Sequence, residues 1–307
     1  MRLCAFVPLV AIAVSGFQSP QPIVVVEPTK QRPDARAERL AGLDSSDDLL
    51  RRAASYVAQF EQTFVAVLWR EDYQQESRVL RRFNASGARF YGAIQRRRLD
   101  SELLFVWLPA DATWIAVRDT IAVDGKPRPA AERRLPALLS SSAVSVGQLR
   151  QLARENGRFN IGRIVRTFNE PTLALLFLGD HYRRRFGFST GREESVNGRL
   201  AAVYDFVERA SPTVIQNKDR DIFAQGTVWI DTETGRVLRT ALNVAHPADQ
   251  VRGRITVDYR HDPKFNVLVP SEMREIYTSS SDDEVTTVAT YSDFRRFETA
   301  GRIILPQ

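Results

Sequence analysis

Short segments of alternating apolar and polar residues, separated by turn residues, fill most of the chain after Gly179. In Arg254–Arg260, the apolar residues Ile255, Val257 and Tyr259 alternate with polar ones, as is typical of a strand with one buried and one solvated face. Strands joined by such short turns pair in antiparallel order, because a parallel pair needs a long crossover, usually a helix. The pattern therefore predicts a large antiparallel sheet.

The strands after Gly179 are expected to follow one another as a meander. The strongest turn signal is Asn197-Gly198, since both residues accept the positive φ that a two-residue hairpin turn needs. We expect eight strands, at Tyr182–Phe188, Ala201–Val207, Gly226–Ile230, Arg236–Leu242, Arg254–Arg260, Phe265–Val269, Met273–Ser279 and Val285–Phe294.

Residues 45–64 predict one amphipathic helix ahead of the sheet. Ser45 and Ser46 are good N-caps, and apolar residues recur at three- and four-residue steps from Leu50 to Phe64. Four strands are expected after it, at Val65–Glu76, Arg89–Arg98, Leu103–Leu108 and Trp114–Val123.

A helical insert is predicted at about residues 130–180, between the two sets of strands. One short helix is expected around residues 146–153 and a second from a cap at Asn160 to Phe168. A third opens at Glu170-Pro171 and ends at Gly179; because it is apolar all round, it should be buried. The order of elements predicts an α+β fold: a large curved antiparallel sheet, or incomplete β-barrel, with helices packed on its concave side.

The N-terminus resembles a secretory signal peptide at residues 1–16, with Arg2 ahead of the apolar run Leu3–Val14 and small residues after it. A buried N-terminal strand is the alternative. Residues 17–44 are rich in proline and predict a disordered linker, which leaves 45–307 as one domain. No segment has the roughly 18–20 apolar residues of a membrane helix. We therefore expect a periplasmic or secreted protein, peripheral to a membrane and not spanning it.

Composition argues against several kinds of site. The net charge is +6, but the 43 basic residues are scattered among 37 acidic ones, which does not predict a nucleic-acid interface. The single cysteine, Cys4, lies in the expected signal peptide, and the three histidines have no partner at metal-ligand spacing. We therefore expect no metal, no cofactor and no catalytic residue.

One motif offers an enzymatic alternative. Gly187–Gly191 matches the nucleophile-elbow pattern of serine hydrolases around Ser189, and His181 is the nearest histidine before it. The pattern has catalytic meaning only at a sharp turn between a strand and a helix. Residues 192–198 are instead expected to form a polar hairpin turn, so a hydrolase is the least favoured function.

Aromatic and apolar residues in the predicted strands are the remaining candidates for a site. A large curved sheet can enclose more volume than its own side chains fill, which would leave an apolar cavity. The alternative is that these residues form an ordinary packed core. The candidates for lining a cavity are Trp69, Phe105, Trp107, Trp114, Trp229, Tyr259, Met273 and Tyr277.

The C-terminal third resembles a known superfamily. The segments "GTVWIDTETGRVLRT" (226–240), "RITVDYRHDPKFNVLVPSEMREIY" (254–277) and "ATYSDFRRF" (289–297) are similar to the periplasmic outer-membrane lipoprotein-sorting proteins. The resemblance implies an incomplete antiparallel barrel covered by helices, with a hydrophobic cavity that holds the acyl chains of a lipoprotein. It implies no particular cargo-contacting residue.

These observations favour a non-enzymatic carrier or binding protein, with a lipid or a lipidated protein as its partner. The bound chain is expected between the sheet and the helices at 45–64 and 170–179. The alternative is a structural module of the envelope, with a packed interior and an apolar patch for a protein partner.

Overall fold

The computed structural model describes residues 48–64, 67–82, 89–108, 113–133, 135–136, 148, 151–152, 155, 157–164, 166, 169–217, 220–246, 251–280 and 283–296. The expected signal peptide (1–16), the expected linker (17–44) and the helix caps Ser45 and Ser46 lie outside these ranges. The division of the chain into these segments and one domain at 45–307 stays a prediction.

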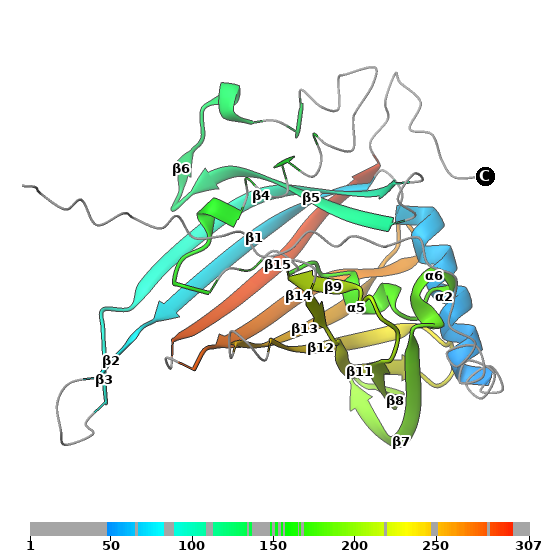
Figure 1. Ribbon diagram of the computed structural model, residues 1–307. Coiled ribbons are helices and arrows are strands. Elements are labelled where there is room, and N and C mark those ends of the chain that lie inside the picture. The colour runs from blue at the N-terminus through cyan, green and yellow to red at the C-terminus, as the bar shows by residue number, and fades with distance from the viewer. Residues whose placement is uncertain are drawn as a thin grey trace, which may run out of the picture.

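Eleven strands form one antiparallel sheet. They are β1 (Val67–Arg78), β4 (Gln95–Leu108), β5 (Thr113–Val123), β6 (Lys126–Pro127), β7 (Phe186–Val196), β8 (Arg199–Glu208), β11 (Gln225–Asp231), β12 (Val237–His246), β13 (Val251–Asp262), β14 (Val267–Thr278) and β15 (Glu284–Arg296). Their order is β6-β5-β4-β1-β15-β14-β13-β12-β11-β8-β7, so the described sheet is open, with β6 and β7 at its edges (Figure 1). The predicted α+β fold with a large antiparallel sheet is confirmed.

The first and last long strands of the chain lie side by side in the middle of this sheet. β11 to β15 follow one another as the predicted meander, and β15 then pairs with β1. Tyr73 of β1 stands opposite Ala289 of β15 on one side and Leu99 of β4 on the other. The centre of the sheet therefore depends on contacts between the two ends of the sequence. Two short pairs stand outside it: β2 (Leu80–Arg82) with β3 (Arg89–Tyr91), and β9 (Ile215–Asn217) with β10 (Arg220–Ile222).

The predicted first helix is present as α2 (Asp48–Phe64), which lies across one end of the strands (Figure 1). Its apolar stripe, including Leu50, Val57 and Phe60, is buried, as the helical spacing predicted. Gly235, in the turn between β11 and β12, has φ +71°, and a Cβ there would lie 2.7 Å from the Cβ of Arg52. Glycine therefore allows this turn to approach the helix closely.

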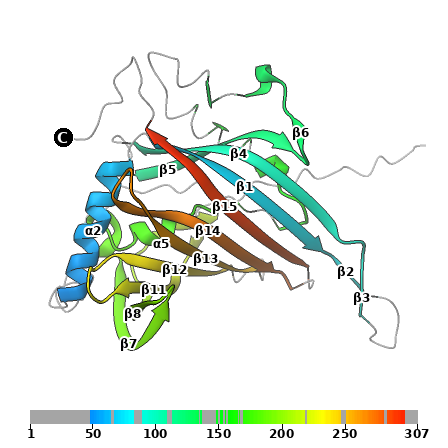
Figure 2. The ribbon, with the colours of Figure 1, turned by 180° about the vertical axis from the view of Figure 1, so that it is seen from behind.

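Two short helices, α5 (Leu173–Leu176) and α6 (Asp180–Arg183), lie on one face of the sheet. They stand in front of the central strands in Figure 1 and behind them in the reversed view of Figure 2. α5 is buried all round, as predicted, but the expected bounds are wrong, because the helix is confined to Leu173–Leu176 and does not extend from Glu170-Pro171 to Gly179. α6 takes the first two residues, Tyr182 and Arg183, of the strand expected at Tyr182–Phe188, so that expected boundary is wrong and β7 begins at Phe186.

The helix expected from Asn160 to Phe168 is wrong in the described residues. A 3₁₀ turn, η2 (Gly157–Phe159), is followed by irregular chain at 160–164. Gly162 has φ +80°, which interrupts a helix, and the backbone N–H of Ile161 donates to Oε1 of Gln75 at 3.2 Å. The carbonyls of Ile161 and Ile164, which a helix would have paired internally, instead accept from the Arg166 side chain. The part of the insert near residue 130 shows a second 3₁₀ turn, η1 (Ala130–Glu132), and Gln148, Gln151, Leu152 and Glu155 are helical.

One pair of predicted strands is a single long strand. Phe265–Val269 and Met273–Ser279 join in β14 across Pro270, which faces Tyr259 where the register with β13 shifts. A proline, which has no N–H, is tolerated at such an irregularity. The strand expected at Arg89–Arg98 is wrong, because it is divided between β3, which ends at Tyr91, and β4, which begins at Gln95. β4 then runs to Leu108 without the break expected before Leu103.

Candidate functional site

The inner face of the sheet is lined at the end near α2 by stacked aromatic rings. We call this cluster the aromatic end; it comprises Phe60, Phe64, Trp69, Phe105, Trp114, Phe265 and Phe294. The rings of Phe105 and Trp114 stack with centroids 4.4 Å apart, and Phe60 stacks on Phe64 at 4.3 Å. All seven side chains are buried. The predicted candidates Trp69, Phe105 and Trp114 therefore come together, in a filled cluster.

The other candidates lie elsewhere. Tyr259, Met273 and Tyr277 are buried on β13 and β14, outside the aromatic end. Trp229 lies on β11, separated from β1 by four strands. Its indole Nε1 donates to Glu194 on β7 at 2.8 Å, and side-chain alternation turns it away from the fully buried Val228 next to it. The backbone of Trp107 pairs with that of Trp114, but its side chain lies outside the described side chains.

Next to the aromatic end, the same inner face carries buried polar side chains. We call these residues the polar layer: Glu71, Tyr73, Gln75, Arg118, Arg166, Asn169, Glu275 and Tyr277. The first contact is an ion pair between neighbouring parts of the sheet. Arg118 of β5 donates to both carboxylate oxygens of Glu71 of β1, at 2.6 and 2.8 Å. The Glu71 side chain has no exposed surface, and this paired geometry compensates its burial.

A second guanidinium, that of Arg166, is 1% exposed. It donates to Gln75 Oε1 at 2.6 Å and to the backbone oxygens of Ile161 and Ile164 at 3.2 and 3.1 Å. All three acceptors are neutral, and its Nε has no hydrogen-bond partner within the described ranges. No carboxylate of the described residues forms an ion pair with the Arg166 guanidinium. Its positive charge is therefore buried without a negative charge in contact with it.

Asn169 connects the covering segment to the sheet. Its Nδ2 donates to the Tyr73 hydroxyl at 3.1 Å and to Glu275 Oε1 at 3.3 Å, while the Tyr277 hydroxyl donates to Glu275 Oε2 at 2.6 Å. Burial and the Glu275 charge raise the pKa of Tyr73 to about 12, and burial raises that of Tyr277 well above its usual value. Both hydroxyls therefore stay protonated and can donate at neutral pH.

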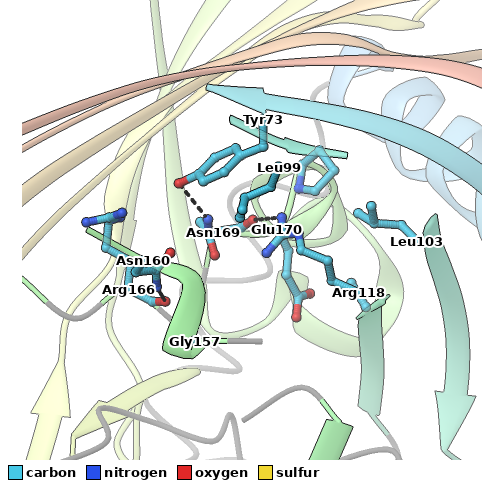
Figure 3. A pocket seen from close by; sticks show the side chains of 11 residues that line it. Tyr73, Leu99, Leu103, Arg118, Gly157, Asn160, Arg166, Asn169 and Glu170 are labelled. Carbon is cyan, nitrogen blue, oxygen red and sulfur yellow. Dashed lines mark hydrogen bonds between the residues drawn. The ribbon is translucent and has the colours of Figure 1, made fainter. Parts of the chain in front are cut away.

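A pocket of about 40 Å³ lies beside the polar layer, and the covering segment contributes residues 157, 160, 166 and 169–171 to its lining (Figure 3). Arg118 and Arg166 stand on opposite sides of it in Figure 3, with Asn169 between them. Its lining is part polar and part apolar: Tyr73, Leu99, Leu103, Ala116, Arg118, Gly157, Asn160, Arg166, Asn169, Glu170 and Pro171. A space of this size holds about three water-sized groups.

One acid of the pocket lining titrates near neutrality. Burial raises the pKa of Glu170 to about 7, although a backbone hydrogen bond from Ala116 and the charge of Arg118 oppose the shift. Perturbed groups in a pocket are typical of functional sites. The pocket wall therefore contains two guanidinium groups and one carboxyl group that is protonated in part at pH 7.

Of the polar layer, the sequence predicted only Tyr277 as a site candidate, and it predicted Tyr277 as part of an apolar cavity wall. A signal is nonetheless present in β1, where Trp69, Glu71, Tyr73 and Gln75 alternate onto one face. Because Trp69 and Tyr73 are large and apolar enough to be buried, the polar residues that follow each of them on the same face, Glu71 and Gln75, must be buried too. The partners Arg118, Arg166 and Asn169 come from distant segments, and no local pattern predicts their approach.

Ser189 does not stand at a nucleophile elbow. It lies within β7, opposite Asp205 of β8, and the strand continues to Val196. The polar turn expected at residues 192–198 is wrong in length, because the turn is confined to Asn197 and Gly198, which have φ of +51° and +78°. The strand-to-helix turn that would expose a serine nucleophile is not formed here. In the ranges that the structure describes, no group of three His, Cys, Asp or Glu could hold a metal ion.

Comparison with known proteins gives only distant structural likeness. No protein-family model matches the sequence, and no curated protein matches it. The chain is similar to a DUF1329 family protein from Desulfovibrio piger, with a TM-score of 0.32, 11% identity and coverage of 81% of this chain and 94% of that one.

Two further solved structures show a similarly low likeness to this chain. A putative outer membrane lipoprotein-sorting protein domain from Vibrio parahaemolyticus has a TM-score of 0.27 and 13% identity, covering 82% of this chain and 95% of that one. Lipovitellin, in a structure of its lipid–protein interactions, has a TM-score of 0.28 and 9% identity, covering 78% of this chain and 26% of that one. The Vibrio domain carries the name of the superfamily that the C-terminal sequence resembles. Of the described helices, none has the length and apolarity to cross a bilayer.

Proposed function

We propose that the chain is a non-enzymatic exported carrier or binding protein, which holds the acyl chain of a lipid or of a lipidated protein against the inner face of its sheet. The observation that carries this proposal is how that face is covered. Over the described ranges it is covered by α2, α5, α6 and irregular chain, and the sheet stays open at β6 and β7. Such a cover can shift without breaking a strand ladder.

The energy for this shift would come from the bound chain. Burial of an acyl chain contributes about 0.8 kcal/mol per methylene, so that about twelve methylenes contribute on the order of 10 kcal/mol. The 40 Å³ pocket is too small for such a chain, so binding requires the cover to move. Phe159 O of the cover accepts from Gln75 Nε2 and from Arg97 Nη1, each at 3.2 Å. Hydrogen bonds of this kind contribute about 0.5–1.5 kcal/mol each, well below the energy of chain burial.

The test is direct binding of a long chain. The purified protein is analysed by native mass spectrometry for bound lipid and then titrated with a fluorescent fatty acid. Ala116→Leu places three more carbons in the pocket wall and should weaken binding, whereas Ala130→Leu, at an exposed position, should not. The absence of both bound lipid and saturable binding would rule the carrier out.

A packed envelope module is the second candidate, and two observations favour it. The pocket is small, and the aromatic end is filled by its own rings. Such a protein would have a protein partner and no lipid. A packed module predicts that the Ala116→Leu and Ala130→Leu variants give the same result in every lipid assay and that neither variant binds a fatty acid.

Export is part of the proposal and is tested separately. Cell fractionation of the full chain should place it in the periplasm or the medium, and deletion of residues 2–16 should keep it in the cytoplasm. If the full chain and the deletion variant are found in the same cell fractions, residues 1–16 are not a signal peptide.

A further inference from the structure

We infer that the pocket between Arg118 and Arg166 is a binding site for a carboxylate, either the headgroup of a fatty acid or a free small carboxylate. The inference deepens the proposed function, because it assigns a chemical class to the polar end of the ligand. Its starting point is the Arg166 side chain, a buried cation that has only neutral acceptors and an unpaired Nε in the described part of the chain.

A buried guanidinium without a counter-ion is costly, and proteins usually pair such a group. Arg118 differs from Arg166 in this respect, because Glu71 accepts from it twice. The buried acid Glu275 is engaged by Asn169 and Tyr277 and forms no ion pair with Arg166 at 4.0 Å or less. The Arg166 guanidinium lies over the Tyr277 ring, 5.6 Å from its centroid. An anion in the pocket would supply the missing charge.

The dimensions and the walls of the pocket select the kind of anion. A carboxylate has three heavy atoms, which matches a space for about three water-sized groups, whereas a phosphate with its four oxygens is larger. The Tyr73 hydroxyl, which accepts from Asn169 Nδ2 and stays protonated at neutral pH, adds a polar hydrogen at the same wall. Leu99, Leu103 and Pro171 supply an apolar wall, against which the first carbons of an acyl chain can pack.

Glu170 makes this site dependent on pH. The charged groups that face the pocket are Arg118, Arg166 and Glu170, with Glu71 and Glu275 behind them in the polar layer. A fatty acid is ionised throughout pH 6 to 8, but Glu170, with a pKa of about 7, becomes negative over this interval. The new charge repels the bound carboxylate, so affinity should fall several-fold as the pH rises.

The experiment compares three ligands that have the same chain and different heads. The full-length protein is titrated by calorimetry at pH 6 and pH 8 with dodecanoate, methyl dodecanoate and dodecanol. Dodecanoate should bind at least tenfold more tightly than the other two at pH 6, and Glu170→Gln should remove the loss of its affinity at pH 8. Acetate is tested separately, by measuring how far it shifts the temperature of thermal unfolding. Because acetate has no acyl chain, this shift reports on the carboxylate site alone.

The outcomes separate this inference from the carrier. Equal binding of acid, ester and alcohol overturns the carboxylate site and leaves the carrier standing. Stabilisation by acetate with no binding of any long chain supports the site and overturns the carrier, and no effect of any ligand overturns both. Arg166→Gln should reduce the preference for acid over ester, with Arg163→Gln, at an exposed arginine of the same segment, as its control. If Arg166→Gln does not fold, the ligand comparison in the unmodified protein still decides.

Discussion

The aromatic end and the polar layer lie on the same face of one sheet and are separated by a single step along β1, from Trp69 to Glu71. What differs is the chain that covers them. Above the aromatic end lies α2, a regular helix whose backbone groups are paired internally, so it needs only an apolar partner. Above the polar layer lie the 3₁₀ turn η2 and the irregular described residues 160–164, 166 and 169–170, which form no α-helical ladder.

The polar layer provides partners for the backbone groups of these covering residues. Gln75 binds the chain at Phe159 and Ile161, Arg166 binds two carbonyls of its own segment, and Nη2 of Arg118 approaches the Asn169 carbonyl at 3.5 Å. A buried backbone group without a partner is costly, and this explains why polar side chains stand where a helix would have permitted apolar ones. The comparison shows that the secondary structure of the covering segment determines which side chains the sheet carries beneath it. A helix requires apolar side chains, whereas irregular chain requires side chains that form hydrogen bonds.

The largest effect is expected from Phe64→Ala at the aromatic end. Phe64 is fully buried and contacts the rings of Phe60, Trp69, Phe265 and Phe294. Loss of a buried phenylalanine side chain costs about 3–5 kcal/mol, and the lost ring pairs place this change at the upper end. Urea unfolding followed by circular dichroism measures it. A loss below about 1 kcal/mol would show that this end is not tightly packed.

Arg118→Met tests the polar layer by leaving Glu71 buried without its cation. Removal of one partner of a buried pair costs about 3–5 kcal/mol, and the lower end is expected because the Arg118 side chain is 18% exposed. The decisive feature is rescue: adding Glu71→Gln to Arg118→Met should recover part of the lost stability. The exposed pair of Arg98 and Asp72 is the control, where Arg98→Met should cost less than about 1 kcal/mol.

Gln75→Ala tests the link between sheet and cover. It removes the acceptor of Arg166 and of the Ile161 N–H and the donor to Phe159, with an expected cost of about 1–3 kcal/mol. If the cover is locally anchored here, hydrogen exchange should accelerate at Ile161 and remain unchanged at Phe60 in α2. Gln74→Ala, one residue away on the exposed face, is the matched control. Uniform acceleration in both places would show that the two regions do not open separately.

The regular parts of the fold could be predicted from the sequence, and the irregular cover could not. Side-chain alternation in Arg254–Arg260 and the helical spacing of Leu50 to Phe64 are local signals, and both elements are present. The helix predicted from Asn160 to Phe168 is wrong because Gly162 has a positive φ and the Arg166 side chain binds the carbonyls of Ile161 and Ile164 that the helix would have paired. Likewise, the Arg118–Glu71 pair joins residues 47 positions apart, which no local pattern reveals.

The smallest expected effect is the pH dependence of stability. One acid beside each region contributes to it: Glu61 beside the aromatic end and Glu170 beside the polar layer. Burial raises the pKa of Glu61 to about 7, with Asp180 adding to the shift and the hydrogen bond from Trp114 opposing it. Burial likewise raises the pKa of Glu170 to about 7. An unfolded glutamate titrates near pH 4.3, so the folded chain holds these protons more strongly. The stabilisation is complete below about pH 4.3 and is lost as the pH rises through 7.

Between pH 5 and pH 8, the loss should be on the order of 1–2 kcal/mol for each acid, because solvent reaches both and reduces the full shift. Glu170→Gln should remove the part of the pH dependence of the unfolding free energy that Glu170 contributes. Glu61→Gln should remove a part of similar size. Groups common to all variants, such as Glu208, cancel in this difference. The two parts should add in the double variant, because the aromatic end and the polar layer are covered by separate segments. Clear non-additivity would mean that ionisation at one region alters the packing of the other, and the contrast drawn between them would then fail.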